Sequence, residues 1–215
     1  MDYGEALKLQ RQLASARMGG EGEDCLLLLE HPPVITLGRE AKREHLLRDE
    51  PLLEQRGVKI CHIERGGDVT FHGPGQLVGY PILDLTRHGK DLHLYVRNLE
   101  EVLIRTLRIY DIHGQRHAGK TGVWVQGDKI GSIGVHVSRW VSRHGFALNV
   151  NTDLSYFDLI VPCGLRGVRM TSMAAFLRRE VPIQAVAETV AQQFGLVFDL
   201  PLTWRPHLEM ALSLP

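Results

Sequence analysis

Twelve residues in the first half of the chain, Arg65 to Gln76, restrict its fold more than any other segment. They read R-G-G-D-V-T-F-H-G-P-G-Q and contain four glycines and one proline. Glycine opens backbone conformations that are closed to other residues, and it lets a ligand approach the main chain closely. We therefore predict that this run is unsuited to the interior of a helix or strand and forms a loop, framed by strands, that belongs to a binding site.

Four polar side chains stand in this run. Arg65 offers a permanent cation, Thr70 a hydroxyl, His72 an imidazole and Gln76 an amide. Such groups together can orient a polar substrate group or stabilise a developing oxyanion. A plain glycine-rich connection between two strands could share this composition. The length and order of the run favour the binding site.

Composition excludes several classes of function. The 215 residues are 44% hydrophobic, and 25 Lys and Arg residues balance 25 Asp and Glu residues. A neutral chain has no global field that draws it to nucleic acid or to an anionic membrane surface. Residues 1–12 lack the apolar core of a signal peptide, and no later segment is long and apolar enough to span a bilayer. We expect a cytoplasmic protein that binds neither nucleic acid nor membranes.

The order of hydrophobic patterns predicts the fold class. No linker, repeat or low-complexity tract divides the chain, so we expect residues 1–215 to form a single catalytic domain. Helices at both ends, one long helix between them and strands elsewhere predict an α+β fold with a mixed or antiparallel sheet flanked by helices. Apolar spacing predicts helices at about 3–18, 92–110 and 183–194, the last ending at Gly195, and strands at 25–29, 34–37, 58–63, 77–85, 122–125, 129–137 and 145–150.

Among the three cysteines, only Cys163 has the surroundings of a reactive group. Cys25 and Cys61 lie in apolar strand patterns, where a cysteine usually behaves as a small buried hydrophobe. Cys163 follows a proline and precedes a glycine, which leaves its thiol sterically open. A free thiol has a pKa of about 8.5, so a catalytic one needs a cation or base nearby.

The candidates for that cation or base are Lys129, His72 and His144. Lys129 begins an apolar strand directly after a turn, where its ammonium could be partly desolvated, although an ordinary solvated hairpin lysine fits the same pattern. Spacing alone does not bring Lys129 and Cys163 together. No Cys/His cluster has metal-ligand spacing, so we expect no metal.

Separate motifs, in one order, point to a known family. They are Arg65 to Gln76, V-G-Y-P at 78–81, K-I-G-S-I-G-V at 129–135, H-G-F-A-L-N-V at 144–150, P-C-G at 162–164 and T-S at 171–172. From about residue 31 to 172 the chain closely resembles the octanoyltransferases of lipoate synthesis, also called lipoate-protein ligase B. Phe71 stands where the family often has tyrosine, and Gly131-Ser132 where it often has two alanines; these departures touch pocket shape more than chemistry.

The resemblance implies an acyltransferase with the α+β fold shared by biotin and lipoate protein ligases, acting as a monomer without a cofactor. Octanoyl carried on acyl carrier protein would pass to Cys163 as a thioester. It would then pass to a specific lysine on a lipoyl domain of a 2-oxoacid dehydrogenase E2 subunit or of the glycine cleavage H protein. Lys129 would stabilise the thiolate and shuttle protons. The substrate-binding residues carried over from the family are Arg65, Gly66, Gly67, Asp68, Val69, Thr70, Phe71, His72, Ser132, Ile133, Gly134, Gly145, Phe146 and Ala147.

Three alternatives stay open. An ATP-dependent lipoate or biotin ligase could share the fold, but the glycine-rich run has no lysine to meet a phosphate, and such a ligase has no need of Cys163. An amidotransferase that moves octanoyl between lipoyl domains would use the same cysteine. A catalytically silent acyl-binding protein would not need Lys129 and Cys163.

Both carriers are acidic proteins, so a neutral enzyme would need a local basic surface to dock them. The candidates for such a docking face are Arg139, Arg143, Arg166, Arg169, Arg178 and Arg179, with scattered solvated arginines as the alternative.

Overall fold

The structure, a computed structural model, describes residues 1–165 and 167–204. Its helices are α1 (Tyr3–Met18), α2 (Glu50–Gln55), α3 (Leu92–Ile109), α4 (Met173–Leu177) and α5 (Ile183–Phe198). Its strands are β1 (Cys25–Leu29), β2 (Val34–Leu37), β3 (Lys59–His62), β4 (Val69–His72), β5 (Gln76–Ile82), β6 (Gln115–His117), β7 (Lys120–Val125), β8 (Asp128–Ser138) and β9 (Val141–Asn149).

The described strands form two sheets. The larger has the order β1-β5-β9-β8-β7-β6, and each neighbouring pair in it is antiparallel. The smaller has the order β3-β2-β4, with β2 parallel to β3 and antiparallel to β4. The predicted α+β class, with mixed and antiparallel sheets flanked by helices, is confirmed.

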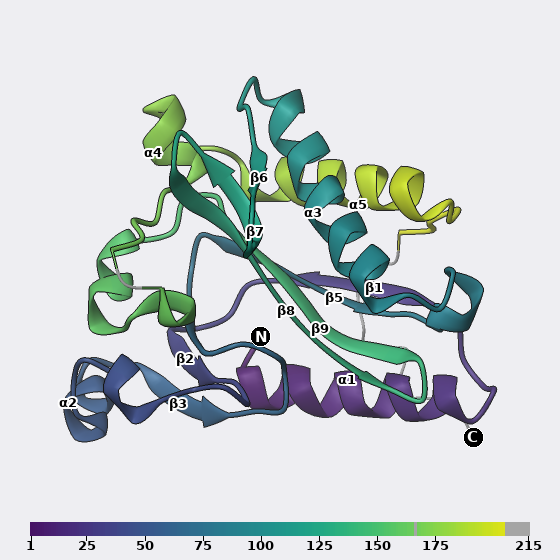
Figure 1. The fold of residues 1–215 in the computed structure, drawn as a ribbon, viewed down its shortest axis with the longest axis horizontal. Coiled ribbons are helices and arrows are strands. Elements are labelled where there is room, and N and C mark those ends of the chain that lie inside the picture. The colour runs from purple at the N-terminus through teal and green to yellow at the C-terminus, as the bar shows by residue number, and fades with distance from the viewer. Residues whose placement is uncertain (166, 205–215) are drawn as a thin grey trace.

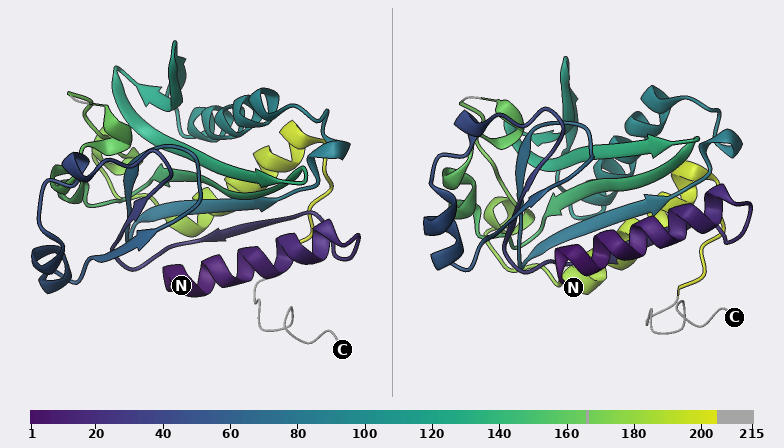
Figure 2. Two further views of the ribbon diagram at one scale, coloured as in Figure 1. Left: turned by 60° about the horizontal axis from the view of Figure 1, so that its bottom comes forward. Right: turned by 90° about the horizontal axis from the view of Figure 1, so that it is seen from below.

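Helices cover both faces of the larger sheet (Figures 1 and 2). Successive residues of a strand point to opposite faces. Leu77 of β5 and Leu148 of β9 therefore join the core under α3 and α5, whereas Val78 and Ala147 pack against α1. The smaller sheet has its own core, which includes Ile35, Val69, Phe157, Leu159 and Ile160. None of the described helices is long and apolar enough to cross a membrane.

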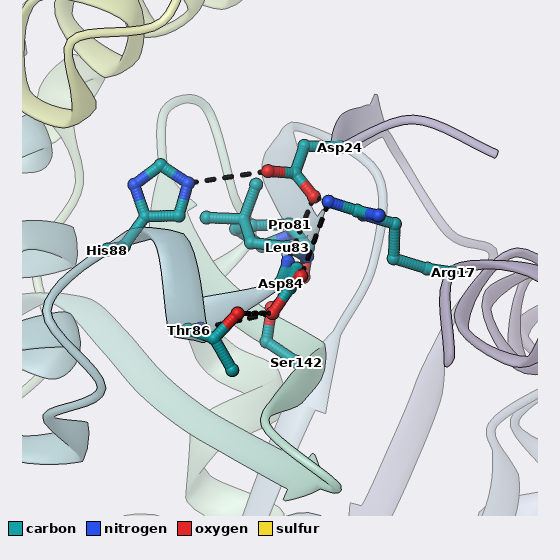
Figure 3. Close-up of polar contacts among 8 residues, drawn as sticks. All are labelled: Arg17, Asp24, Pro81, Leu83, Asp84, Thr86, His88 and Ser142. Atoms are coloured by element: carbon teal, nitrogen blue, oxygen red, sulfur yellow. Dashed lines mark hydrogen bonds and ion pairs between the residues drawn. The ribbon is translucent and has the colours of Figure 1, made fainter. Parts of the chain in front are cut away.

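A polar cluster fastens the end of α1 to the larger sheet (Figure 3). Arg17 Nε donates to Asp24 Oδ1 at 2.7 Å, and the backbone N–H of Asp84 donates to the same oxygen at 2.9 Å. Ser142 Oγ donates to the carbonyl of Pro81 and accepts from the N–H of Leu83, which ties β9 to the end of β5. These contacts fix α1 across the sheet, so that its first turn lies near the site described below.

One prediction about the glycine-rich run is wrong. Val69–His72 forms strand β4, which is buried along its whole length and pairs with β2 from Val34↔His72 to Leu37↔Val69. The four residues of this strand include a valine, a threonine and a phenylalanine, which suit a pleated, buried surface. The glycines flank this strand and do not exclude it.

The predicted end of the last helix is also wrong. Helix α5 continues past Gly195 to Phe198 and ends where Asp199 takes a left-handed conformation, with φ of 53°. Phe198 stacks on Phe194 with ring centroids 4.4 Å apart, and both rings are buried. A glycine inside a helix costs about 1 kcal/mol, and burial of the extra aromatic turn offsets it.

Candidate active site

Two distant residues meet at the centre of the site. Lys129, the second residue of β8, directs its Nζ at Cys163 Sγ, 3.2 Å away. Lys129 is buried, and Cys163 is half-buried in the short helical turn Pro162–Gly164. The chain beyond that turn returns to β8, where the N–H of Lys129 donates to the carbonyl of Arg169 and the N–H of Thr171 donates to the carbonyl of Lys129, both at 2.9 Å. This pairing holds the cysteine turn beside the lysine.

The backbone at Cys163 is strained. Its φ is 55°, a left-handed conformation that costs an ordinary residue about 1–2 kcal/mol. Gly164, with φ of 67°, follows in the same region, where glycine carries no such penalty. A Cβ at Gly164 would lie 2.6 Å from Asp68 Oδ2, so the turn packs too closely for a side chain there. Strain of this kind persists only where surrounding contacts hold it.

A buried carboxylate and imidazole provide part of that support. Asp68 Oδ2 and His45 Nδ1 are 2.6 Å apart, and the carbonyl of His45 accepts from the N–H of Val161 at 2.8 Å. Asp68 Oδ1 also accepts from the N–H of Val69 at 2.7 Å. The glycine-rich run therefore reaches the cysteine turn through Asp68, and sequence analysis did not single out His45.

A cavity opens beside Cys163 between the first turn of α1, strands β4, β5, β8 and β9, and the start of the glycine-rich run. The predicted binding residues that line it are Arg65, Thr70, His72, Ser132, Ile133, Gly134, Gly145, Phe146 and Ala147. The register pairs Ser132 with Ala147, Ile133 with Phe146 and Gly134 with Gly145. Two segments that are separate in the sequence therefore form one continuous wall.

The other predicted binding residues lie in the glycine-rich run and strand β4, away from the cavity lining. The N–H of Gly66 donates to the carbonyl of Val135 at 2.9 Å, and this hydrogen bond attaches the glycine-rich run to β8. Phe71 stacks on Tyr156 with centroids 4.5 Å apart in the core of the smaller sheet. The structure does not bring these residues to the cavity: Gly66, Gly67, Asp68, Val69 and Phe71.

Two cavity residues were not predicted. Tyr3 comes from the first turn of α1, and Tyr80 comes from β5. Tyr80 belongs to the V-G-Y-P motif that supports the family resemblance, but its position in the cavity was not predicted. Nothing in the local pattern around Tyr3 signals that α1 reaches the cavity. His144, considered only as an alternative base, also lines it.

Burial disfavours the charged form of three histidines in and beside the cavity, His31, His72 and His144. Burial lowers the pKa of His72 to about 3 and that of His144 to about 3. Burial likewise lowers the pKa of His31 to about 4, and its Nε2 lies 2.7 Å from the Tyr80 hydroxyl. His72 Nδ1 lies 2.7 Å from Gln76 Oε1. The nearest charged base or cation to Cys163 among these candidates is Lys129.

Arg65 brings a second positive charge to the cavity. Its Nη2 donates to the carbonyl and the hydroxyl of Thr36, at 2.8 and 2.9 Å, which anchors the glycine-rich run to β2. The side chain is buried. Within residues 1–165 and 167–204, no group of three His, Cys, Asp or Glu side chains could hold a metal ion.

The predicted arginine docking face does not assemble among the described residues. Arg139 lies in the turn that precedes β9, and Arg178 and Arg179 follow α4 near the opposite end of that strand (Figures 1 and 2). Arg143 pairs with Glu64 at 2.7 Å, and Arg169 with Asp128 at 3.0 Å. Arg166 lies outside the described residues. The sequence did not reveal that the strand separates these arginines.

Comparison with known proteins identifies the family. Residues 2–195 match the lipoyl protein ligase A/B catalytic domain. The chain is 53% identical over 202 residues to an octanoyltransferase of Solibacter usitatus, covering 94% of this chain and 91% of that one, and 47% identical over 215 residues to one of Geobacter metallireducens, covering 100% and 96%.

A solved structure supports the fold. The putative lipoate protein ligase of T. acidophilum with bound lipoic acid superposes with a TM-score of 0.71 at 16% identity, covering 91% of this chain and 82% of that one. The predicted lipoate-ligase fold is thereby confirmed. The chain belongs to the lipoyl protein ligase A/B catalytic domain family and, within it, to the octanoyltransferases.

Proposed function

We propose that this protein transfers an octanoyl group from octanoyl-acyl carrier protein to a lysine of a lipoyl domain, through a thioester on Cys163. The observation that carries the proposal is the 3.2 Å contact between Lys129 Nζ and Cys163 Sγ at the edge of the cavity. A thiolate is the nucleophilic form of cysteine, and an adjacent ammonium favours it. The lipoyl-domain acceptors are those of 2-oxoacid dehydrogenase E2 subunits and of the glycine cleavage H protein.

In the first step, the Cys163 thiolate attacks the thioester carbonyl of the donor. The bond from that carbonyl to the carrier sulfur breaks, and the departing thiolate takes a proton from the Lys129 ammonium. One thioester replaces another, so this step is close to isoenergetic and needs no nucleotide.

In the second step, the acceptor lysine, as the free amine, attacks the Cys163 thioester. The amine gives its proton to neutral Lys129, and the Cys163 thiolate departs as the amide forms. The starting ion pair is restored. Amide formation from a thioester is downhill, which makes the transfer irreversible in practice.

The cavity wall suits an acyl chain. Ile133, Phe146 and Ala147 give it an apolar surface next to Cys163. Gly134 and Gly145 face each other across β8 and β9 and leave that wall without side chains at one point. A Cβ at Gly134 would lie 3.0 Å from the carbonyl oxygen of Gly66, and one at Gly145 would meet the carbonyl oxygen of Gly79, so these glycines let neighbouring backbone pack closely against the wall.

The test is incubation with octanoyl-acyl carrier protein without ATP, followed by intact mass. We expect wild type to gain one octanoyl group, Cys163→Ala to gain none, and Cys61→Ala, which removes a half-buried thiol in β3, to behave as wild type. A strict requirement for ATP would overturn the proposal in favour of a ligase. An octanoylated lipoyl domain offered as donor separates the amidotransferase, because only that enzyme loads from it faster than from the carrier protein.

We also propose that the enzyme is cytoplasmic, monomeric and built from a single domain. The thiols of Cys25, Cys61 and Cys163 are free, which fits a reducing compartment. Cell fractionation tests the location. Light scattering tests the monomer, which a stable dimer at micromolar concentration would contradict.

A further inference from the structure

Among the described residues, no carboxylate pairs with the buried ammonium of Lys129. Its side chain is 2% exposed, and within residues 1–165 and 167–204 it forms no ion pair with Asp or Glu. Its ammonium donates to Cys163 Sγ. Burial of an ammonium is unfavourable unless other groups compensate the lost hydration. The groups around its side chain therefore decide where the ammonium lies.

Trp124 provides one such group. Lys129 Nζ lies 5.6 Å from the centroid of the Trp124 ring, within the range of a cation–π contact. The two residues are partners across β7 and β8, and the register shifts between Val123 and Trp124. Irregularities of this kind re-aim side chains in a strand pair. The hairpin thus brings the face of an indole ring against the ammonium.

The indole N–H of Trp124 indicates what the residue contributes. Trp124 is 2% exposed, and its Nε1 is buried with no hydrogen-bond partner in the described part of the chain. A buried tryptophan usually finds a partner for this group. Leucine or phenylalanine would fill the space without that penalty. The property that tryptophan alone adds here is the most electron-rich ring face, which attracts a cation most strongly.

Gly122, which lies on β7 with Trp124, leaves room for the side chain of Lys129 from β8. A Cβ at this position would lie 2.8 Å from Lys129 Cε and 3.4 Å from Nζ, and the φ of Gly122 is 123°. Its N–H donates to Oε1 of the buried Glu100 at 3.0 Å, which holds the backbone in place. The lysine stem passes this open position before its ammonium reaches Cys163.

We infer that Trp124 is a positioning residue, which holds the Lys129 ammonium at Cys163 by a cation–π contact in the gap left by Gly122. The inference rests on the proposed function, because it assigns Lys129 to the chemistry of Cys163. Other charged or titratable groups also surround this lysine, Trp124 and Cys163. They are Lys120, whose Nζ lies 5.4 Å from the Trp124 ring, His117, whose ring centroid lies 5.3 Å from that ring, Glu100 behind Gly122, the Asp128–Arg169 pair, and Arg65 in the cavity wall with Cys163.

The test measures alkylation of Cys163 by iodoacetamide against pH, on the peptide that contains it, together with single-turnover octanoyl loading. Trp124→Leu should move the alkylation profile to higher pH and slow loading about tenfold, at an unchanged KM for the donor. Trp124→Phe, which keeps a ring, should restore part of both. The matched control is Trp140→Leu, because Trp140 also lies under a lysine, Lys90, at 5.4 Å, in the turn between β8 and β9.

A fluorinated tryptophan ring provides a second test, which does not depend on whether Trp124→Leu folds. Replacement of all tryptophans by 5-fluorotryptophan weakens the ring face and keeps its shape. It should shift alkylation to higher pH in wild type and in Trp140→Leu, and not in Trp124→Phe. Wild-type alkylation and loading in folded Trp124→Leu, or no shift with the fluorinated ring, would overturn the inference. Failure of wild type to load without ATP would overturn the proposed function alone, since the alkylation profile still reports the position of Lys129.

Discussion

Acid should destabilise this protein well above the pH at which carboxylates titrate, because three of its buried histidines are held neutral. Burial lowers the pKa values of His31, His72 and His144 to about 4, 3 and 3, from the ordinary histidine value of about 6.5. The folded state therefore binds fewer protons than the unfolded chain between these limits. Stability is fully present above about pH 6.5 and is lost as the pH falls toward the folded-state values.

The magnitude follows from proton linkage. Each histidine that is charged only in the unfolded chain contributes a slope of about 1.4 kcal/mol per pH unit. Between pH 7 and pH 5 each of the three should cost roughly 2 kcal/mol, or about 6 kcal/mol together. This loss is comparable with the whole stability of an ordinary domain, about 5–15 kcal/mol. The protein should therefore approach unfolding near pH 5.

Urea denaturation at pH 7, 6 and 5, followed by circular dichroism, measures this loss. His144→Asn should reduce the loss between pH 7 and pH 5 by roughly 2 kcal/mol, because one such proton is removed; asparagine also tolerates the left-handed backbone, φ 56°, of this position. The matched control, His62→Gln, replaces an exposed histidine of β3 and should leave the slope unchanged. A free energy of unfolding that stays level from pH 7 to pH 5, or an equal slope in His144→Asn, would refute the reasoning.

Substitutions at two further residues, Gly79 and Lys129, test the cavity and the proposed chemistry. Gly79→Ala should lower the free energy of unfolding in urea by about 1–3 kcal/mol, because a Cβ at Gly79 would overlap the ring of Phe146 in the cavity wall; wild-type stability would show that the ring moves freely. Lys129→Ala should shift Cys163 alkylation to higher pH and abolish octanoyl transfer, whereas Lys129→Arg should keep much of the thiolate and lose transfer, since guanidinium does not release its proton. Wild-type turnover in Lys129→Ala would show that Lys129 has only a structural role in the β7–β8 hairpin.

Local patterns predicted those elements whose structure depends on local packing. The spacing of apolar residues gave the bounds of α1, β1 and β2 as the structure has them, and those of α3 to within a residue. The strands predicted at 122–125 and 129–137 lie within β7 and β8, and the turn residues Gln126-Gly127-Asp128 between them favour a hairpin. In each case the periodicity of the segment itself contains the signal.

Elements and contacts that depend on distant partners were missed. Strand β4 is a strand because β2 lies beside it, and the glycines around it hid that pairing. Residues 129 and 163 are far apart in sequence, and only the resemblance to a family joined them. Their meeting depends on a bridge between Lys129 and Met170 that no pattern signals. Tyr3 reaches the cavity because a polar cluster at the other end of α1 fixes that helix across the sheet.

The proposed chemistry needs one sulfur to meet two substrates in turn while the lysine beside it stays in place. Two sets of backbone contacts meet this need. Before the cysteine, the N–H of Val161 donates to the carbonyl of His45, whose ring is held by Asp68 of the glycine-rich run. After it, residues 169–171 pair with the backbone of Lys129 itself. Because the strand that carries the lysine also holds the chain leaving Cys163, a shift of one residue moves the other with it. The ion pair that the first transfer consumes can then re-form in place during the second, and the carriers, not the thiol, make the large movements.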